Sequence, residues 1–192
     1  MEARKPYDID SLTDVALRVF AERGYDGASM DDVAVEAGIT KASIYHHVSG
    51  KEALLARGLG RALDALYAIL DEEQANRGRA VARLRYIVRR VVEITLRHLS
   101  EVTMLFRVRG NSPTERDALD RRRRFDRIVA EIVATAQSDG DVRADLDAGL
   151  ITRLAFGMSN SLVEWYRPDG AIDDAAMTHA ILAVIFEGLA PR

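Results

Sequence analysis

Apolar residues recur at steps of three and four along almost the whole 192-residue chain, and this spacing constrains the fold more than any other feature. Leu55, Leu59, Leu63, Leu66 and Leu70, for example, fall on one stripe of a helix. No segment shows the two-residue alternation of a half-buried strand, and no internal repeat interrupts the pattern. The chain is therefore predicted to be all-α, with about nine helices.

Composition limits the classes of protein to consider. Hydrophobic residues make up 48% of the chain and charged residues 30%, which is typical of a soluble globular protein. With no cysteine, the chain has no disulfide, no thiolate nucleophile and no cysteine metal site. No apolar run approaches the roughly 20 residues that a bilayer requires, and residues 1–5 do not begin a signal peptide. We therefore expect a cytoplasmic protein that does not associate with a membrane.

Charge is unevenly distributed along the chain, although the net charge is only −3. Residues 1–50 carry 5 Lys and Arg against 9 Asp and Glu, whereas residues 77–127 carry 15 Arg and no Lys against 6 acids. The acidic N-terminal segment lacks the bulk positive charge of many nucleic-acid-binding domains. A role in DNA binding must therefore rest on a motif.

Three short helices are predicted before residue 50. The first begins near Asp8 or Asp10 and ends at Gly24, and the second, over about residues 30–37, follows a capping box opened by Ser29. Gly38-Ile39-Thr40 then leads into a third helix over about residues 41–47. Two short helices joined by a glycine turn have the spacing of a helix-turn-helix motif.

The third helix would present side chains suited to DNA. Lys41 and the free N–H groups beside it can meet a phosphate, as can Tyr45. Ala42, Ser43 or His46 can reach base edges or a thymine methyl. As an alternative, His46 and His47 could hold a metal, but adjacent helical residues point in different directions and no third ligand is evident.

These segments resemble the TetR family of transcriptional regulators. The runs that carry the resemblance are Phe20-Ala21-Glu22-Arg23-Gly24-Tyr25, Ser29-Met30-Asp31-Asp32-Val33-Ala34, Ala37-Gly38-Ile39-Thr40-Lys41-Ala42-Ser43-Ile44-Tyr45-His46-His47 and Lys51-Glu52-Ala53-Leu54-Leu55. The resemblance is dense over residues 9–57, and Val48 departs from it because the family usually has an aromatic residue there. It implies a DNA-binding domain at 1–50 and an effector-binding and dimerisation domain at 51–192.

The family's DNA contacts fall on matching positions of this chain. They imply that Thr40, Lys41, Tyr45 and His46 touch DNA and that Lys51 grips a phosphate. Together with the residues proposed from the helix itself, the predicted DNA-binding set is Thr40, Lys41, Ala42, Ser43, Tyr45, His46, His47 and Lys51. The expected partner is a double-stranded operator.

Four consecutive arginines, residues 121–124, are the sharpest feature outside the motif. If Phe125 faces inward on a helix, Arg121 and Arg122 border the buried face. Guanidinium groups at the mouth of an apolar tunnel suit a long apolar molecule that carries phosphates, such as an acyl-CoA thioester. The alternative is that these arginines are solvated or paired with neighbouring acids.

A second, shorter resemblance points to the same class of effector. The run Trp165-Tyr166-Arg167-Pro168-Asp169-Gly170 resembles the end of the eighth helix in TetR-type repressors of fatty-acid, phenylacetate and steroid catabolism, several of which respond to acyl-CoA. The predicted effector-binding residues are Leu66, Arg107, Arg109, Arg121, Arg122, Phe125, Phe156, Asn160 and Trp165. The alternatives are that the apolar members are ordinary core and that the effector is a hydrophobic drug or antibiotic.

The last two predicted helices, near 146–166 and 174–189, are apolar almost all round and so need cover on every side. We expect a partner subunit to supply that cover, and a two-fold dimer demands a palindromic operator. We find no nucleophile with a base at recognisable spacing, no metal signature and no phosphate-binding glycine loop, so we predict no catalytic residue, metal or cofactor. The rival class is an acyl-CoA-binding protein without DNA function, which the motif at 29–47 disfavours.

Overall fold

The computed structural model describes residues 8–188, and the regular secondary structure of that part is entirely helical. It packs as two compact units. The head unit comprises the chain up to Arg61 together with residues 100–119, and the body unit comprises residues 62–99 and the chain from Asp120 onward. Two helices, α4 (Lys51–Ala68) and α8 (Pro113–Ser138), contribute residues to both units. The head unit is therefore larger than the segment 1–50 that the motif marks.

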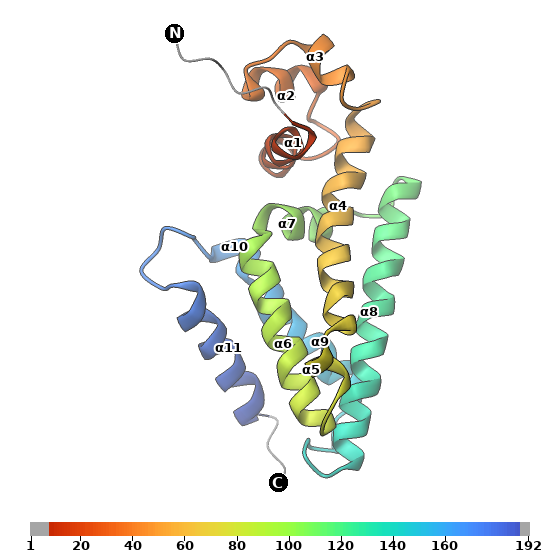
Figure 1. Cartoon of the computed structure of the whole chain (residues 1–192), viewed down its shortest axis with the longest axis vertical. Coiled ribbons are helices and arrows are strands. Elements are labelled where there is room, and N and C mark those ends of the chain that lie inside the picture. Colours follow the sequence, from red (N-terminus) through yellow and green to blue (C-terminus); the bar gives the residue numbers. More distant parts are fainter. Residues whose placement is uncertain (1–7, 189–192) are drawn as a thin grey trace. The chain divides into compact units, whose positions relative to one another are not determined.

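The first two helices begin and end at the predicted signals, and the third begins where it is expected; Figure 1 shows all three. Helix α1 (Ile9–Arg23) is capped by Asp8, whose carboxylate accepts a hydrogen bond from the Ser11 N–H at 2.7 Å. Helix α2 (Met30–Ala37) has the predicted capping box between Ser29 and Asp32. Helix α3 (Lys41–Tyr45) ends two residues earlier than expected, and Thr40 caps it.

The interior of the head unit is apolar and closely packed. Leu12, Phe20, Ile44 and Leu54 are fully buried there. Helix α7 (Leu99–Arg107) joins this unit from a distant part of the sequence, because the Arg107 guanidinium donates to the carbonyl of Ala21 at the end of α1. The support of the helix-turn-helix thus includes a residue 86 positions further along the chain.

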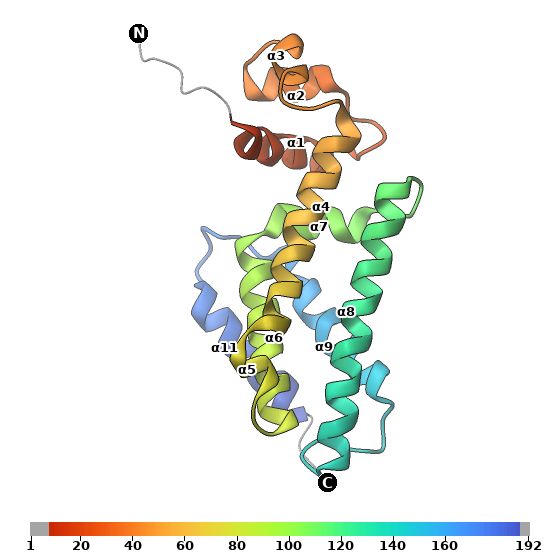
Figure 2. The same cartoon turned by 45° about the vertical axis from the view of Figure 1, so that its right-hand side comes forward.

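The body unit is a helical bundle. Helix α6 (Ala80–Arg97) packs against α9 (Ala148–Asn160) and α11 (Asp174–Gly188), and Figure 2 shows these three helices side by side. Its core is a single cluster of aliphatic and aromatic side chains from these helices and from α8. None of the helices between residues 8 and 188 has both the length and the hydropathy needed to cross a bilayer.

Two helices predicted as continuous are divided in the structure. The first ends at Ala68 and is followed by a 3-10 turn, η1 (Ile69–Asp71), and by α5 (Glu73–Asn76). Glu72 between them is extended, and its carboxylate accepts hydrogen bonds from Arg90 at 3.0 Å and from the Tyr86 hydroxyl at 2.5 Å. The second is split at Ser161 into α9 and α10 (Leu162–Trp165).

Candidate nucleic-acid interface

Helix α3 turns one apolar residue inward and leaves most of its polar residues exposed. Ile44 is fully buried, whereas the Tyr45 side chain is 49% exposed. The turn before it is fixed by Gly38, whose φ of +61° lies in the left-handed region, and by the Ile39 N–H, which donates to the Ala34 carbonyl at 3.1 Å. The exposed members of the predicted DNA-binding set are Thr40, Lys41, Ala42, Tyr45, His46 and His47.

Two of these residues already have partners within the head unit. The Thr40 hydroxyl accepts the Ser43 N–H at 3.1 Å and lies 2.8 Å from the Ser43 hydroxyl, so both hydroxyls serve the cap of α3. The Lys41 ammonium donates to a carboxylate oxygen of Asp31 at 2.8 Å, and this bond raises the pKa of Lys41. Sequence reasoning missed Asp31, although it stands in the first turn of the neighbouring helix.

Lys51 has several partners within the head unit. Its ammonium donates to the carbonyls of Tyr25 at 2.7 Å and Ala28 at 3.0 Å, and it lies 4.4 Å from the centre of the Tyr25 ring. An ammonium has three donors and these contacts occupy it, so Lys51 fastens the loop between α1 and α2. The predicted phosphate contact of Lys51 stays a prediction.

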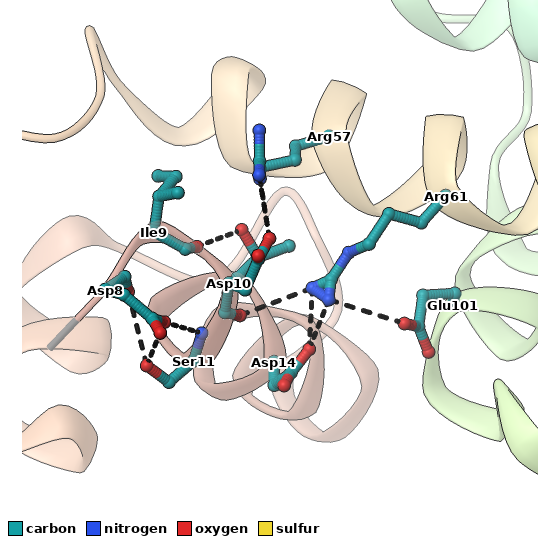
Figure 3. A network of polar contacts seen from close by, with 9 residues as sticks. Asp8, Ile9, Asp10, Ser11, Asp14, Arg57, Arg61 and Glu101 are labelled. Atoms are coloured by element: carbon teal, nitrogen blue, oxygen red, sulfur yellow. Dashed lines mark hydrogen bonds and ion pairs between the residues drawn. The ribbon is translucent and has the colours of Figure 1, made fainter.

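A polar network joins α1 to α4 and α7 within the head unit, as Figure 3 shows. Arg57 pairs with Asp10 at 2.7 Å, and Arg61 pairs with Asp14 at 2.7 Å and with Glu101 at 3.7 Å. Burial raises the pKa of Asp14 even though Arg61 opposes the shift. Sequence reasoning missed this network, but acids at 10 and 14 and arginines at 57 and 61 share a four-residue step that matches one helix face to another.

Two of the predicted effector-binding residues form the aromatic core of the body unit. Phe125 and Phe156 are buried and stack with ring centres 5.9 Å apart, and Tyr67 approaches Phe125 edge-on at 5.9 Å. Phe156 also lines a narrow apolar cavity of about 10 Å³ between α6, α8, α9 and α11. That volume is close to the minimum for one water molecule, so an acyl chain requires this cavity to widen.

The remaining members of the predicted set, apart from the arginines, are less enclosed. Leu66 packs against the edge of the core and Asn160 is half-buried. Trp165 is 52% exposed, and its indole N–H donates to the Ser161 hydroxyl at 3.3 Å. The end of α10 thus leaves the Trp165 ring partly on the surface, and its place in an effector pocket stays a prediction.

The predicted arginines are divided between the two units of the chain. Arg121 pairs with Asp64 at 2.6 Å and lies 5.5 Å from the Tyr67 ring centre, and burial lowers the pKa of the neighbouring Arg122. Arg107 and Arg109 belong to the head unit, where Arg107 bonds a carbonyl of α1 and Arg109 is exposed. Arg121 and Arg122 are both half-buried in the body unit, and the role of the four arginines in effector binding stays a prediction.

The predicted dimer helices divide their apolar residues between two faces. Ile181, Ile185 and the small residues Ala155 and Ser159 are buried in the body unit's own core. The outward apolar residues are Leu150, Leu154 and Met158, spaced four apart on α9, and Val184 on α11. Leu189, at the end of the predicted interface, lies outside the described residues.

Comparison with known proteins covers nearly the whole chain. Residues 12–57 match the family "Bacterial regulatory proteins, tetR family", and residues 77–189 match "Tetracyclin repressor-like, C-terminal domain". A crystal structure of a TetR-family member from Streptomyces coelicolor A3 is 52% identical, with a TM-score of 0.88 over 97% of this chain and 93% of its own.

More distant relatives add names with a stated function. The HTH-type transcriptional repressor KstR2 of Rhodococcus jostii (strain RHA1) is 29% identical over 93% of this chain and 89% of its own. The structure of AibR in complex with isovaleryl coenzyme A and operator DNA has a TM-score of 0.78 at 23% identity, over 93% of this chain and 97% of its own.

Proposed function

Because the chain belongs to the TetR family of transcriptional regulators, we propose that it represses transcription by binding a palindromic operator as a homodimer until a small-molecule effector releases it. The observation that supports this DNA surface is the exposure of α3 and its flanking residues: Ile44 is buried, whereas the exposed residues are Thr40, Lys41, Ala42, Tyr45, His46 and His47. Its role is regulatory and not catalytic. A regulator of this kind acts where the chromosome lies, which in a bacterium is the cytoplasm.

The DNA surface is tested by two variants of α3. Tyr45→Phe removes a hydroxyl proposed to meet a phosphate, so we expect weaker binding to all sequences. His46→Ala removes a proposed base contact, so we expect the preferred operator to change. Selection of bound sequences from a random duplex pool, followed by anisotropy titration, measures both effects. Full affinity and an unchanged operator in both variants would show that the DNA surface lies elsewhere.

Dimerisation is proposed through the outward faces of α9 and α11. Leu150, Leu154 and Met158 form an exposed apolar stripe on α9, and Val184 is exposed on α11. Such a stripe is costly in water and is removed by a second copy about a two-fold axis. The axis would set two α3 helices about 34 Å apart, one turn of DNA.

The proposed effector is an acyl-CoA thioester. Support comes from AibR, which was crystallised with isovaleryl coenzyme A and operator DNA. In this chain, the aromatic pair Phe125 and Phe156 would receive the acyl part, and the half-buried Arg122 would meet an anionic group. Because the cavity beside Phe156 is so narrow, the ligand would select a widened state of the body unit.

A release titration tests this effector class. We expect acyl-CoA thioesters to free operator DNA at lower concentration than the matching free acids or coenzyme A. Arg122→Ala should weaken that response, whereas Arg123→Ala should not, because Arg123 is exposed and pairs with Asp120 on the surface. Release by a neutral hydrophobic compound, with every thioester inactive, would favour the alternative of a drug-responsive regulator.

A further inference from the structure

The helices α2 and α3 begin with side chains of opposite charge that meet. Asp31 stands in the first turn of α2 and Lys41 opens α3, and the ammonium donates to the carboxylate at 2.8 Å. Both side chains remain accessible, with 67% of Asp31 and 47% of Lys41 exposed. The pair therefore lies on the same exposed surface as the proposed DNA contacts.

The fold does not depend on this pair. Asp32, and not Asp31, closes the capping box with Ser29 and pairs with Arg23. The cap of α3 is made by Thr40 and Ser43. An exposed pair of this kind contributes little to stability, so its consequence lies in what else Lys41 can bind.

We propose that Asp31 acts as an internal competitor for DNA, occupying the Lys41 ammonium with a carboxylate where a phosphate would otherwise bind. The proposal rests on the proposed DNA surface. To meet a phosphate, Lys41 must leave Asp31, and the carboxylate then faces the negatively charged duplex without its partner. Asp31 thus weakens binding to DNA of any sequence and leaves discrimination to the residues that read bases.

Salt dependence distinguishes this competition from a general effect of charge. A lysine that contacts a phosphate releases about one counterion from DNA. When Lys41 leaves Asp31, the exposed carboxylate takes up a cation from solution. This uptake partly cancels the release of a counterion from the DNA. Removing the carboxylate should therefore raise affinity and also steepen the dependence of log K on log salt, by up to about one unit.

The test compares Asp31→Asn with Glu36→Gln in the full-length protein. Glu36 is an exposed acid on the same helix, so its variant makes the same change in net charge without touching Lys41. Each variant is also made in a Lys41→Met background. Affinities for the selected operator and for a random duplex are measured by anisotropy at several salt concentrations, and thermal unfolding confirms that each variant is folded.

We expect Asp31→Asn to bind both duplexes roughly two- to five-fold more tightly than Glu36→Gln does, with the steeper salt dependence. This difference should vanish in the Lys41→Met background. Equal effects of the two acid variants, or an Asp31→Asn effect that persists without Lys41, would overturn the proposal. If Lys41→Met leaves DNA binding unchanged, the placement of the DNA surface has failed instead.

Discussion

Two glycines of α4, two residues apart, have opposite surroundings. A Cβ added to Gly58 would lie 2.6 Å from a methyl carbon of the fully buried Leu17, whereas a Cβ added to Gly60 would meet nothing within 4 Å. Gly58 thus lets α1 approach α4 closely, and Gly60 serves no packing purpose.

We therefore expect Gly58→Ala and Gly60→Ala to change stability in opposite directions. Alanine in a helix interior gains about 1 kcal/mol over glycine, and Gly60→Ala should show that gain as a higher Tm. At Gly58 the added methyl overpacks a closed interior, which costs about 1–3 kcal/mol and should lower the Tm. Two equal increases in calorimetry would show that Leu17 moves aside freely.

Lys51 and Lys41 are expected to respond differently to replacement by methionine. Lys51→Met removes the donor to the carbonyls of Tyr25 and Ala28, so the Tm should fall. Lys41→Met should leave the Tm unchanged and reduce the salt slope of DNA binding, by less than about one unit while Asp31 is present. The reverse pattern, with an unchanged Tm and a lower slope for Lys51→Met, would support the phosphate contact that the family resemblance implies.

The turn between α7 and α8 is organised by one buried carboxylate. An oxygen of Glu115 accepts the backbone N–H groups of Arg109 and Gly110 at 2.8 Å and of Asn111 at 3.2 Å. Burial raises the pKa of Glu115, but the three donors outweigh it and the pKa is lowered overall. The ionised form is thus favoured in the folded protein.

A lowered pKa gives the sign of the pH dependence. The ionised Glu115 stabilises the folded protein at pH values above 4.5, its usual pKa. This stabilisation is lost as the pH falls through the lower pKa that Glu115 has in the folded protein. We expect Glu115→Gln to cost about 1–3 kcal/mol at neutral pH, and the difference from the native protein to shrink in acid. Denaturant unfolding at several pH values measures this difference in the free energy of unfolding, and Asp117→Asn, at an exposed residue, is the control. A difference independent of pH would rule out this role of the charge.

Whether the ends of a helix can be predicted from sequence depends on how far apart along the chain the residues that define those ends lie. The caps at Asp8, Ser29 and Thr40 act within three residues, and the first three helices were predicted from them. The break after Ala68 could not be predicted in this way, because the leucine spacing continues through it. Glu72, which follows the break, is hydrogen-bonded to Arg90, eighteen positions away. The proposed DNA surface is formed by residues that are close in sequence, whereas an effector pocket depends on which distant arginines lie together in the fold.

At the scale of the whole molecule, the exposed apolar stripe on α9 is proposed to set the oligomeric state. Leu154 lies in the middle of the α9 stripe and is 60% exposed, while Val35 on α2 is 81% exposed. Leu154→Glu buries a charge in the proposed interface, so we expect a monomer that binds the operator weakly. Val35→Glu should remain a dimer. Sedimentation velocity measures the mass, and a dimeric Leu154→Glu protein would exclude this face.

The two-part composition of the head unit has a consequence for its synthesis. Residues up to 61 leave the ribosome first, but Glu101 and Arg107, which bind Arg61 and the end of α1, are still to be translated. At typical elongation rates, the 58 residues from 61 to 119 take about 3 to 12 s. During that interval the nascent chain carries its helix-turn-helix without part of its support, so we expect the head to finish folding only after residue 119 has emerged.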